Sequence, residues 1–135
     1  MNIEITKQFL SIMYEQHFVR HKDFIEIRQI NQPNDIKRGY ASSIDLVLET
    51  VKKYDGNIYF GVLPRAEKKG NKKAIKYATC LWADIDCGKA GHKGQANFTT
   101  KEQAIKHLET YDKQPTIIID SGHGFHYYWV LATTV

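Results

Sequence analysis

Hydrophobic residues recur at helical spacing in three stretches: roughly residues 4–17, the segment after Ser43 and the segment after Thr100. Residues three or four apart lie on one face of a helix, so each stretch predicts an amphipathic helix. Ser42 and Ser43 are candidate N-caps of the second helix, and Thr100 with Gln103 has the pattern of a capping box that opens the third. The apolar positions are Ile5, Phe9, Ile12, Met13, Ile44, Val47, Leu48, Val51, Ala104, Ile105, Leu108 and Tyr111.

Short apolar stretches bounded by turn residues predict strands between and after these helices. The segment "DFIEIRQI" alternates apolar and polar side chains, which predicts a half-buried strand closed by Pro33. "IYFGVLP" predicts a short apolar strand, and "YATCLWADID" predicts the longest strand of the chain. The last two strands, "TIIID" and "FHYYWVLA", are separated only by "SGHG" and therefore predict a tight connection.

The order of these elements predicts an α+β fold, or a mixed α/β sheet with helices on one face. Strands and helices alternate in the first half, whereas the second half has a strand, a helix and two closely joined strands. The length of 135 residues is that of one domain and is enough to bury a core without disulfides. The sequence contains no internal repeat and no linker.

Composition narrows the class of protein. Hydrophobic residues make up 42% and charged residues 25%, which indicates an ordinary globular protein rather than a disordered or fibrous one. No apolar run is long enough to span a bilayer, and the N-terminus lacks the pattern of a signal peptide, so we expect a cytoplasmic protein without a membrane partner. The two cysteines are too few for a disulfide framework. The net charge of +4 is mild evidence for a polyanionic partner.

Two aspartates stand one residue apart at the end of the strand "CLWADID". Residues i and i+2 of a strand point to the same face, so Asp84 and Asp86 would direct two negative charges at one place. Two ionised carboxylates at this spacing repel each other unless a cation lies between them, and hard oxygen ligands suit Mg²⁺ or Mn²⁺. Alternatively, the two aspartates begin a turn and accept hydrogen bonds from backbone N–H groups of the glycine-rich loop that follows.

The connection "SGHG" and the strand after it contain a second candidate site. Ser121, Gly122 and Gly124 permit backbone conformations in which several N–H groups converge on an anion. His126 begins the next strand, where an imidazole can donate to a triphosphate or shuttle a proton. The alternative for His126 is a packed, hydrogen-bonded residue of an aromatic strand, and we expect His123 at the tip of the turn to be solvated.

Basic residues are concentrated in "RAEKKGNKKAIK", which contains six basic side chains and one acidic side chain. Glycine and asparagine within it predict a solvated loop or a hairpin tip. Arg65 begins this segment, and its guanidinium can pair with two oxygens at once or lie at the surface as a cation. A lysine run contacts a nucleic-acid backbone or forms a solvated face. Its candidate lysines are Lys68, Lys69, Lys72 and Lys73.

Cys80, Cys87 and His92 are residue types that bind zinc. A structural zinc site needs four ligands, usually in close CxxC-type spacing, whereas a strand separates the two cysteines here. We therefore expect no zinc, and we expect Cys80 to be a buried strand residue.

The order of these motifs resembles the archaeo-eukaryotic primase superfamily, particularly the primase-polymerase domains of plasmids and phages. "WADID" resembles the first motif of that family, an apolar strand that ends in DxD or DxE, and "DSGHGFHYYW" resembles the second, S-G-x-G-x-H. "YFGVLPR" is similar to a strand that precedes the first motif in the plasmid and phage branch. The resemblance covers roughly residues 58–131, about half of the chain.

The resemblance implies a template-directed nucleotidyltransferase, a DNA primase or primase-polymerase in the replication of a plasmid, phage or other mobile element. Asp84 and Asp86 would then bind two divalent ions, Mg²⁺ or Mn²⁺, that bridge the phosphates of the incoming nucleotide. Ser121, through its hydroxyl or neighbouring amides, and His126 would bind the β- and γ-phosphates. Arg65 would contact a phosphate or the template. The partners would be nucleoside triphosphates, a single-stranded DNA template and a fused or associated helicase.

The family has a third motif, a downstream strand with another acidic residue that completes the metal site. This sequence ends at Val135, soon after His126, and Asp120 precedes the serine instead of lying on a later strand. We therefore expect a fragment of a longer catalytic domain that lacks part of what activity requires. The family fold implies an N-terminal α/β part, about residues 1–75, and the start of an RRM-like part, about residues 76–135.

Two other functions stay open. An RRM-like sheet binds single-stranded nucleic acid without catalysis when exposed aromatic rings stack on the bases. A replication-initiator nuclease also uses an RRM-like sheet, but it needs two histidines separated by one residue. Two residues separate His123 from His126, which argues against the nuclease. The rings that could stack on bases are Phe125, Tyr127, Trp129 and Trp82.

Overall fold

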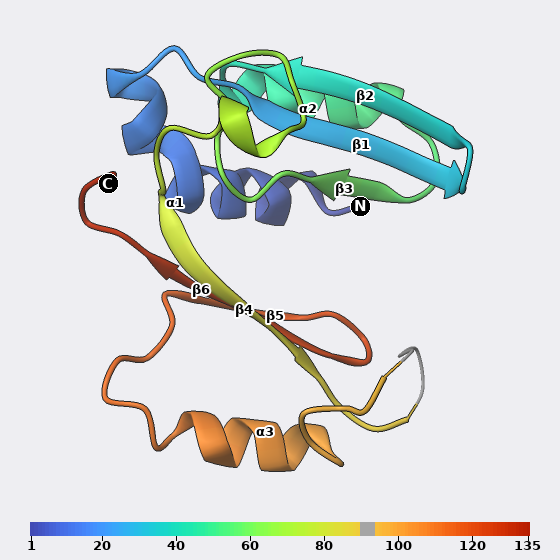
Figure 1. The fold of residues 1–135 in the computed structure, drawn as a ribbon, viewed down its shortest axis with the longest axis vertical. Coiled ribbons are helices and arrows are strands. Elements are labelled where there is room, and N and C mark those ends of the chain that lie inside the picture. The colour runs from blue at the N-terminus through green and yellow to red at the C-terminus, as the bar shows by residue number, and fades with distance from the viewer. Residues whose placement is uncertain (90–93) are drawn as a thin grey trace. The chain divides into compact units, whose positions relative to one another are not determined.

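A computed structural model describes residues 1–89 and 94–135 of the chain. The chain forms two compact units, unit 1 with residues 1–79 and 132–135 and unit 2 with residues 80–131. Each unit has its own three-stranded antiparallel sheet (Figure 1). The prediction of an α+β fold is confirmed, but the strands form two small sheets rather than the single sheet expected from the order of the elements.

Unit 1 contains two helices, α1 (Ile3–Arg20) and α2 (Ile44–Lys53), and a sheet with the order β2-β1-β3. The central strand β1 (Ile25–Gln32) pairs with β2 (Asp35–Ala41) and with β3 (Ile58–Phe60). The predicted N-cap of α2 is confirmed, since the side chain of its N-cap serine accepts a hydrogen bond from the backbone N–H three residues on.

The edge strand β2 is an element that the sequence analysis missed. Its sequence "DIKRGYA" is polar and has no clear apolar alternation, so the pattern predicts no strand there. The segment is extended because it pairs with β1 along nearly its whole length, from Ile25 opposite Ala41 to Gln32 opposite Asp35. Long-range pairing, and not local sequence preference, produces this strand.

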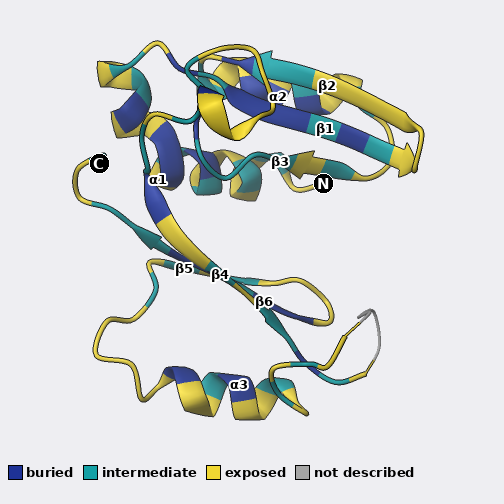
Figure 2. Cartoon of the chain, viewed as in Figure 1, coloured by how far each residue is buried: buried dark blue, intermediate teal, exposed yellow. Residues whose placement is uncertain are grey.

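The helices of unit 1 cover one face of its sheet. Ile25 and Ile27 of β1 are 0% exposed on this face, and Phe60 of β3 contacts the ring of Phe9 in α1 at a centroid distance of 5.4 Å. The other face of β1 is also covered, because Glu26 is only 1% exposed. Figure 2 shows most of β1 as buried. The prediction of a half-buried strand is therefore wrong at Glu26, which is as buried as its neighbours, whereas Arg28 farther along the same face is 33% exposed.

A buried polar cluster joins α1 to the last residues of the chain, which belong to unit 1. Nε2 of His17 lies 2.8 Å from Oδ2 of Asp23, and Nδ1 of His17 lies 3.3 Å from Oγ1 of Thr134. Backbone hydrogen bonds between Ala78 and Val135 run in both directions. These contacts hold residues 132–135 within unit 1.

The described residues of unit 2 form a sheet with the order β4-β6-β5 and one helix. Its strands are β4 (Cys80–Asp86), β5 (Ile117–Asp120) and β6 (Gly124–Val130), and its helix is α3 (Lys101–Leu108). One half of the predicted capping box of α3 is present, because Thr100 Oγ1 accepts from Gln103 N at 3.2 Å. The Gln103 side chain reaches one residue further, since its Oε1 accepts from Thr99 N at 3.1 Å. Tyr111, predicted to lie on this helix, follows its end.

The core of unit 2 lies between α3 and one face of the sheet. It contains Phe125 and Tyr127 of β6, with Ala104 and Leu108 of α3 packed against them. The opposite face of the sheet therefore carries the alternate residues of β4 and β6, including Asp84 and His126. Among the helices of the described residues, none combines the length and the apolar character that crossing a membrane requires.

Candidate nucleotide-binding site

Two motifs that are far apart in the sequence come together on the sheet of unit 2. β4 pairs with β6 in a register that places Asp84 directly opposite His126. Residues directly opposite each other in an antiparallel pair have neighbouring side chains on one face. Oδ1 of Asp84 lies 3.5 Å from Nε2 of His126, and their side chains are 68% and 42% exposed. The register thus forms an acid–imidazole pair that is open to solvent.

Asp86 extends this pair along the same face of β4, because it lies two residues beyond Asp84. Its cross-strand partner is Gly124, which has no side chain to fill the neighbouring position. A Cβ atom on Gly124 would clash with the carbonyl oxygen of Ile85 and come within 3.2 Å of the Asp86 Cα. Glycine is therefore required here for β4 and β6 to approach each other in this register.

The backbone of Asp86 also fixes the loop that follows β4. Asp86 N donates to Asn97 Oδ1 at 2.9 Å, and Asp86 O accepts from Asn97 N at 3.0 Å and from Phe98 N at 3.2 Å. The contacts between the end of the strand and the loop thus use main-chain groups of Asp86. They hold the strand end that carries the two carboxylates.

The turn between β5 and β6 is closed by its own hydrogen bonds. Ser121 N donates to Gly124 O at 3.0 Å, and Gly122 N donates to Oδ1 of Asp120 at 2.8 Å. Gly122 has a φ of +96°, in the left-handed region that favours glycine. The predicted convergence of N–H groups on an anion is therefore wrong for these two amides, which are used inside the turn. Ser121 and His123 are exposed at its tip.

Asp120 stabilises this turn and does not join the aspartate pair. Nζ of Lys101 lies 2.7 Å from Oδ1 of Asp120, and this hydrogen bond, followed by the one from Gly122 N, lowers the pKa of Asp120. Asp120 is paired with Phe125, which packs towards α3, whereas Asp84 is on the other face of the sheet. It is therefore not a third carboxylate for the pair.

Tyr128 lies two residues beyond His126 on the face that carries Asp84. Burial, followed by the nearby Cys80 and Asp84, raises the pKa of Tyr128 to about 12. Its phenol is therefore neutral at physiological pH. A neutral phenol adds no charge to the face on which Asp84 and His126 meet.

The four aromatic rings considered for base stacking have different environments. Phe125 and Tyr127 are 8% and 2% exposed in the core beneath α3. Trp129 packs against the same core, and its Nε1 donates to the carbonyl of Lys113 at 2.9 Å. Trp82 is 49% exposed and lies on the same face of β4 as Asp84. Of the four rings, Trp82 is therefore the best placed to stack on a base.

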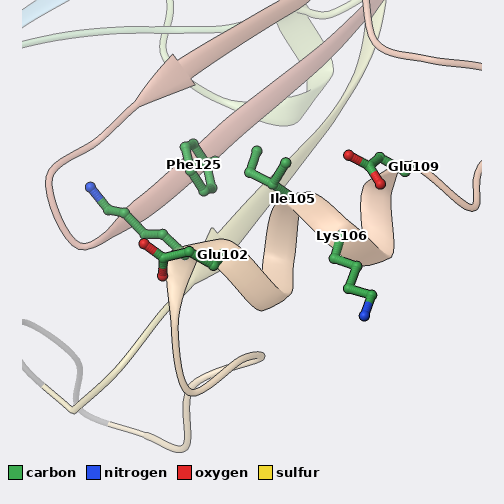
Figure 3. A pocket seen from close by; sticks show the side chains of 6 residues that line it. Glu102, Ile105, Lys106, Glu109 and Phe125 are labelled. Atoms are coloured by element: carbon green, nitrogen blue, oxygen red, sulfur yellow. The ribbon is translucent and has the colours of Figure 1, made fainter.

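A shallow hollow of about 560 Å³ lies on the other face of the sheet, beside α3. Figure 3 shows Ile105 and Phe125 next to each other there, with Glu102 and Glu109 near the two ends of the helix. Because Phe125 faces α3 and His126 faces the opposite way, this hollow is separate from the acid–imidazole pair. Its lining residues are Lys101, Glu102, Ile105, Lys106, Glu109 and Phe125.

The donor atoms of Asp84 and Asp86 suit a hard divalent cation. Mg²⁺ is commonly bound by one or two carboxylates, with water and substrate phosphates as its remaining ligands. Within residues 1–89 and 94–135, no three His, Cys, Asp or Glu side chains are grouped so that they could hold a metal ion by themselves. The pair therefore fits a site that a substrate completes, and it does not fit a closed structural site.

The residues considered for zinc are Cys80, Cys87 and His92. Both cysteines are buried thiols, and burial raises the pKa of Cys87. The prediction that Cys80 is a buried strand residue is confirmed by its exposure of 1%. His92 lies outside the described residues.

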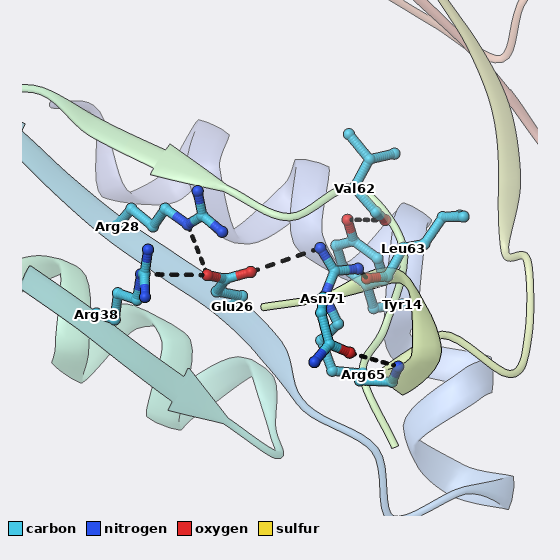
Figure 4. A network of polar contacts seen from close by, with 9 residues as sticks. Tyr14, Glu26, Arg28, Arg38, Val62, Leu63, Arg65 and Asn71 are labelled. Carbon is cyan, nitrogen blue, oxygen red and sulfur yellow. Dashed lines mark hydrogen bonds and ion pairs between the residues drawn. The ribbon is translucent and has the colours of Figure 1, made fainter. Parts of the chain in front are cut away.

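Arg65 belongs to unit 1, where it is largely buried beside Glu26 (Figure 4). Its Nη1 donates to Leu63 O at 2.6 Å, and its Nη2 lies 3.5 Å from Oε2 of Glu26. The side chain is 11% exposed, so the alternative of a surface cation is wrong. Nη1 and Nη2 are engaged by groups of its own unit, and the role of Arg65 as a phosphate or template contact stays a prediction.

The predicted nucleic-acid-binding lysines, Lys68, Lys69, Lys72 and Lys73, are all exposed. Lys69 pairs with Glu67 at 2.9 Å. The segment contains one short 3-10 helix, η1 (Lys72–Ala74), whose first turn is capped by Asn71. It is therefore a loop with a helical turn and not a hairpin tip.

Sequence reasoning missed the arginine cluster around Glu26. Arg28 Nε lies 2.6 Å from Glu26 Oε1, Arg38 Nε lies 4.0 Å from the same oxygen, and Arg65 approaches the other oxygen. The hydrogen bond with Glu26 raises the pKa of Arg28. The sequence did contain a sign of this cluster: Glu26 lies between two isoleucines of a predicted strand, and Arg28 follows it on the same face.

Comparisons with protein-family models, curated proteins and solved structures found no match to this chain. The functional argument therefore depends on the geometry of the site and on its motifs.

Proposed function

We propose that this chain is part of a template-directed nucleotidyltransferase of the archaeo-eukaryotic primase type. The observation that carries the proposal is the pairing of Asp84 with His126, at 3.5 Å, across β4 and β6. Two separate motifs suggested the function: "WADID" predicted a carboxylate pair, and "DSGHGFHYYW" predicted an imidazole. The side chains of Asp84 and His126 are exposed neighbours on one face of the sheet.

The requirements of folding do not account for this arrangement. A contact between two polar side chains exposed to this degree contributes about 0–1 kcal/mol to stability. Asp86 adds a second negative charge to the same face, at a position opposite Gly124. A face that gathers two carboxylates and an imidazole at the surface is better explained by a charged ligand than by stability.

In the proposed reaction, the 3′-hydroxyl of a primer attacks the α-phosphate of a nucleoside triphosphate, the bond to the bridging oxygen breaks and pyrophosphate leaves, and the hydroxyl proton passes to solvent. Asp84 and Asp86 would hold Mg²⁺ or Mn²⁺, and the bound ions would neutralise phosphate charge and lower the pKa of the attacking hydroxyl. His126 would donate a hydrogen bond to the β- or γ-phosphate, and the exposed hydroxyl of Ser121 would contribute from the neighbouring turn. The side chains thus bind and orient the reactants, which is the main task of the protein in phosphoryl transfer.

Calorimetric titration of the chain with a nucleoside triphosphate, in the presence and absence of Mn²⁺, tests the proposal. We expect Mn²⁺-dependent binding that is lost in Asp84→Asn and weakened in His126→Phe. The double variant Glu102→Gln/Glu109→Gln is the matched control, because it removes two carboxylates from the α3 side of the same unit. Equal loss in the control, or binding that Asp84→Asn leaves unchanged, would contradict the proposal.

Catalysis is tested in a longer polypeptide that contains this chain and an additional acidic motif. Primer extension on a single-stranded DNA template should require Asp84 and Asp86. Because both carboxylates lie at a strand end, their replacement by asparagine should leave the circular dichroism spectrum unchanged. Extension that persists in both variants would reject the assigned metal ligands.

A non-catalytic single-stranded nucleic-acid-binding module is the second candidate, and the exposure of Trp82 favours it. In that case Trp82→Ala would weaken oligonucleotide binding, and Asp84→Asn would leave it unchanged or strengthen it by removing a negative charge. The nuclease alternative lacks comparable support, since His123 lies at the tip of the turn and His126 lies on a strand.

A further inference from the structure

A row of arginine and tyrosine side chains crosses the sheet of unit 1 on the face opposite its helices. In the register of the sheet, Arg28 of β1 lies directly between Arg38 of β2 and Tyr59 of β3. All three side chains therefore share one face. Arg38 and Tyr59 are each 53% exposed, and Arg28 is 33% exposed.

This row carries more positive charge than its surroundings neutralise. Like charges directly opposite each other destabilise a sheet, and Arg28 and Arg38 are such a pair. The one carboxylate among them, Glu26, is shared with Arg65, so three guanidinium groups surround a single negative charge. An anion bound at the row would relieve the remaining repulsion.

The lysine-rich loop continues this surface. A Cβ atom on Gly70 would lie 2.7 Å from Oε1 of Glu26 and 2.8 Å from Nη2 of Arg28, so the loop is seated directly on this ion pair. Only glycine permits so close an approach without displacing the carboxylate or the guanidinium. Lys72 and Lys73 follow in η1 and are exposed. The loop that carries these lysines thus contacts the arginine row, and we call the row and the loop together the basic surface of unit 1.

We propose that this surface binds the backbone of single-stranded nucleic acid. Guanidinium groups pair with phosphate oxygens, lysines add a diffuse positive field, and the exposed ring of Tyr59 can stack on an unpaired base. A base can reach the ring in this way only when it is not stacked within a duplex. The inference assigns a polynucleotide site to unit 1, and it does not require nucleotidyl transfer in unit 2.

The test is fluorescence anisotropy of a labelled oligothymidylate, measured over a range of salt concentrations with a chelator and without nucleotide. Lys72→Gln/Lys73→Gln should weaken binding several-fold and reduce the slope of log K against log salt by about 0.7 for each phosphate that the variant no longer neutralises. Arg38→Gln should act similarly, and Glu26 remains paired with Arg28 in that variant. Tyr59→Leu should weaken binding while leaving the salt slope unchanged.

The matched control is Lys52→Gln/Lys53→Gln, which removes the same charge from the exposed end of α2. It should bind as the parent chain does. Equal weakening in the control would show a general charge effect and overturn the proposal. A duplex that binds as tightly as the single strand would overturn it too. The assay contains no nucleotide, so it does not depend on nucleotidyl transfer. The two proposals can therefore fail separately.

Discussion

The two sheets place their acidic residues in opposite environments. In unit 1, Glu26 is 1% exposed and lies between guanidinium groups that neutralise it. In unit 2, the side chain of Asp84 is 68% exposed and has an imidazole 3.5 Å away as its neighbour across the strands. Both residues are carboxylates on strands, and each faces a basic group.

This difference in exposure distinguishes a carboxylate that stabilises the fold, Glu26, from one that is available to a ligand, Asp84. A buried carboxylate must be paired, because the loss of hydration is large and only close partners compensate for it. An exposed pair is solvated in any case, so its geometry adds little to stability. We therefore assign Glu26 to the stability of unit 1 and Asp84 to binding in unit 2, and the following variants test this contrast.

The largest expected effect on stability is that of Glu26→Gln. It leaves the mostly buried Arg65 without its carboxylate, which we expect to destabilise unit 1 by about 3 kcal/mol. Urea unfolding followed by circular dichroism measures the change. Glu67→Gln is the control, because Glu67 forms an exposed pair with Lys69 in the loop that covers Glu26. If both variants unfold at the same urea concentration, Glu26 is not a structural charge.

Gly124→Ala should have the next largest effect, on unit 2. The added methyl group would clash with the Ile85 carbonyl and force β4 away from β6, at an expected loss of about 2 kcal/mol. Both tryptophans of the chain are in unit 2, so their fluorescence reports its unfolding. Gly94→Ala, where an added Cβ meets no atom within 4 Å, should unfold with the parent chain. An unchanged midpoint in Gly124→Ala would contradict the register that joins Asp84 and His126.

Tyr128 predicts a smaller, pH-dependent effect on the same unit. Its pKa is raised from 10.0 to about 12, so the folded state resists ionisation that the unfolded chain undergoes freely. The resulting stability is present below pH 10 and is lost as the pH rises towards about 12. Tyrosinate absorbance and urea unfolding across this interval measure the loss. Between pH 10 and about 12, Tyr128→Phe should lose less stability than the parent chain. An identical loss would contradict the assignment of the pH dependence to Tyr128.

The smallest expected change in stability is that of Asp84→Asn, which should lie within about 0.5 kcal/mol of the parent chain. The same substitution should abolish Mn²⁺-dependent triphosphate binding. Loss of stability comparable to that of Glu26→Gln would make Asp84 a structural residue and remove the contrast between the two sheets.

Local patterns in the sequence predicted the elements that are defined by local interactions. The caps at Ser43 and Thr100 mark the beginnings of α2 and α3 because a capping side chain bonds to amides only two or three residues away. β2 and the burial of Glu26 could not be read in this way. The first depends on pairing with β1, and the second depends on residues 61–75 covering the face that alternation had assigned to solvent.

In the candidate site too, local features were predictable from the sequence, and features that depend on long-range contacts were not. Alternation placed Asp84 and Asp86 on one face of a strand, but their proximity to His126 depends on the register of β4 against β6, which local periodicity does not specify. The turn at residues 121–124 was expected to present amides to an anion. Instead, Asp120 and Gly124 O accept two of them, an outcome set by the Asp side chain that begins the turn.

The most direct test of the ligand-binding assignment is paramagnetic broadening by Mn²⁺ in the nuclear magnetic resonance spectrum of the chain with a nucleoside triphosphate. If the exposed acid–imidazole face binds the metal–nucleotide complex, the signals of Asp84, Asp86 and His126 should broaden first, at the lowest Mn²⁺ concentrations. In Asp84→Asn this selective broadening should disappear. Broadening that begins instead at Glu102 and Glu109 beside α3, and that persists in Asp84→Asn, would contradict the account.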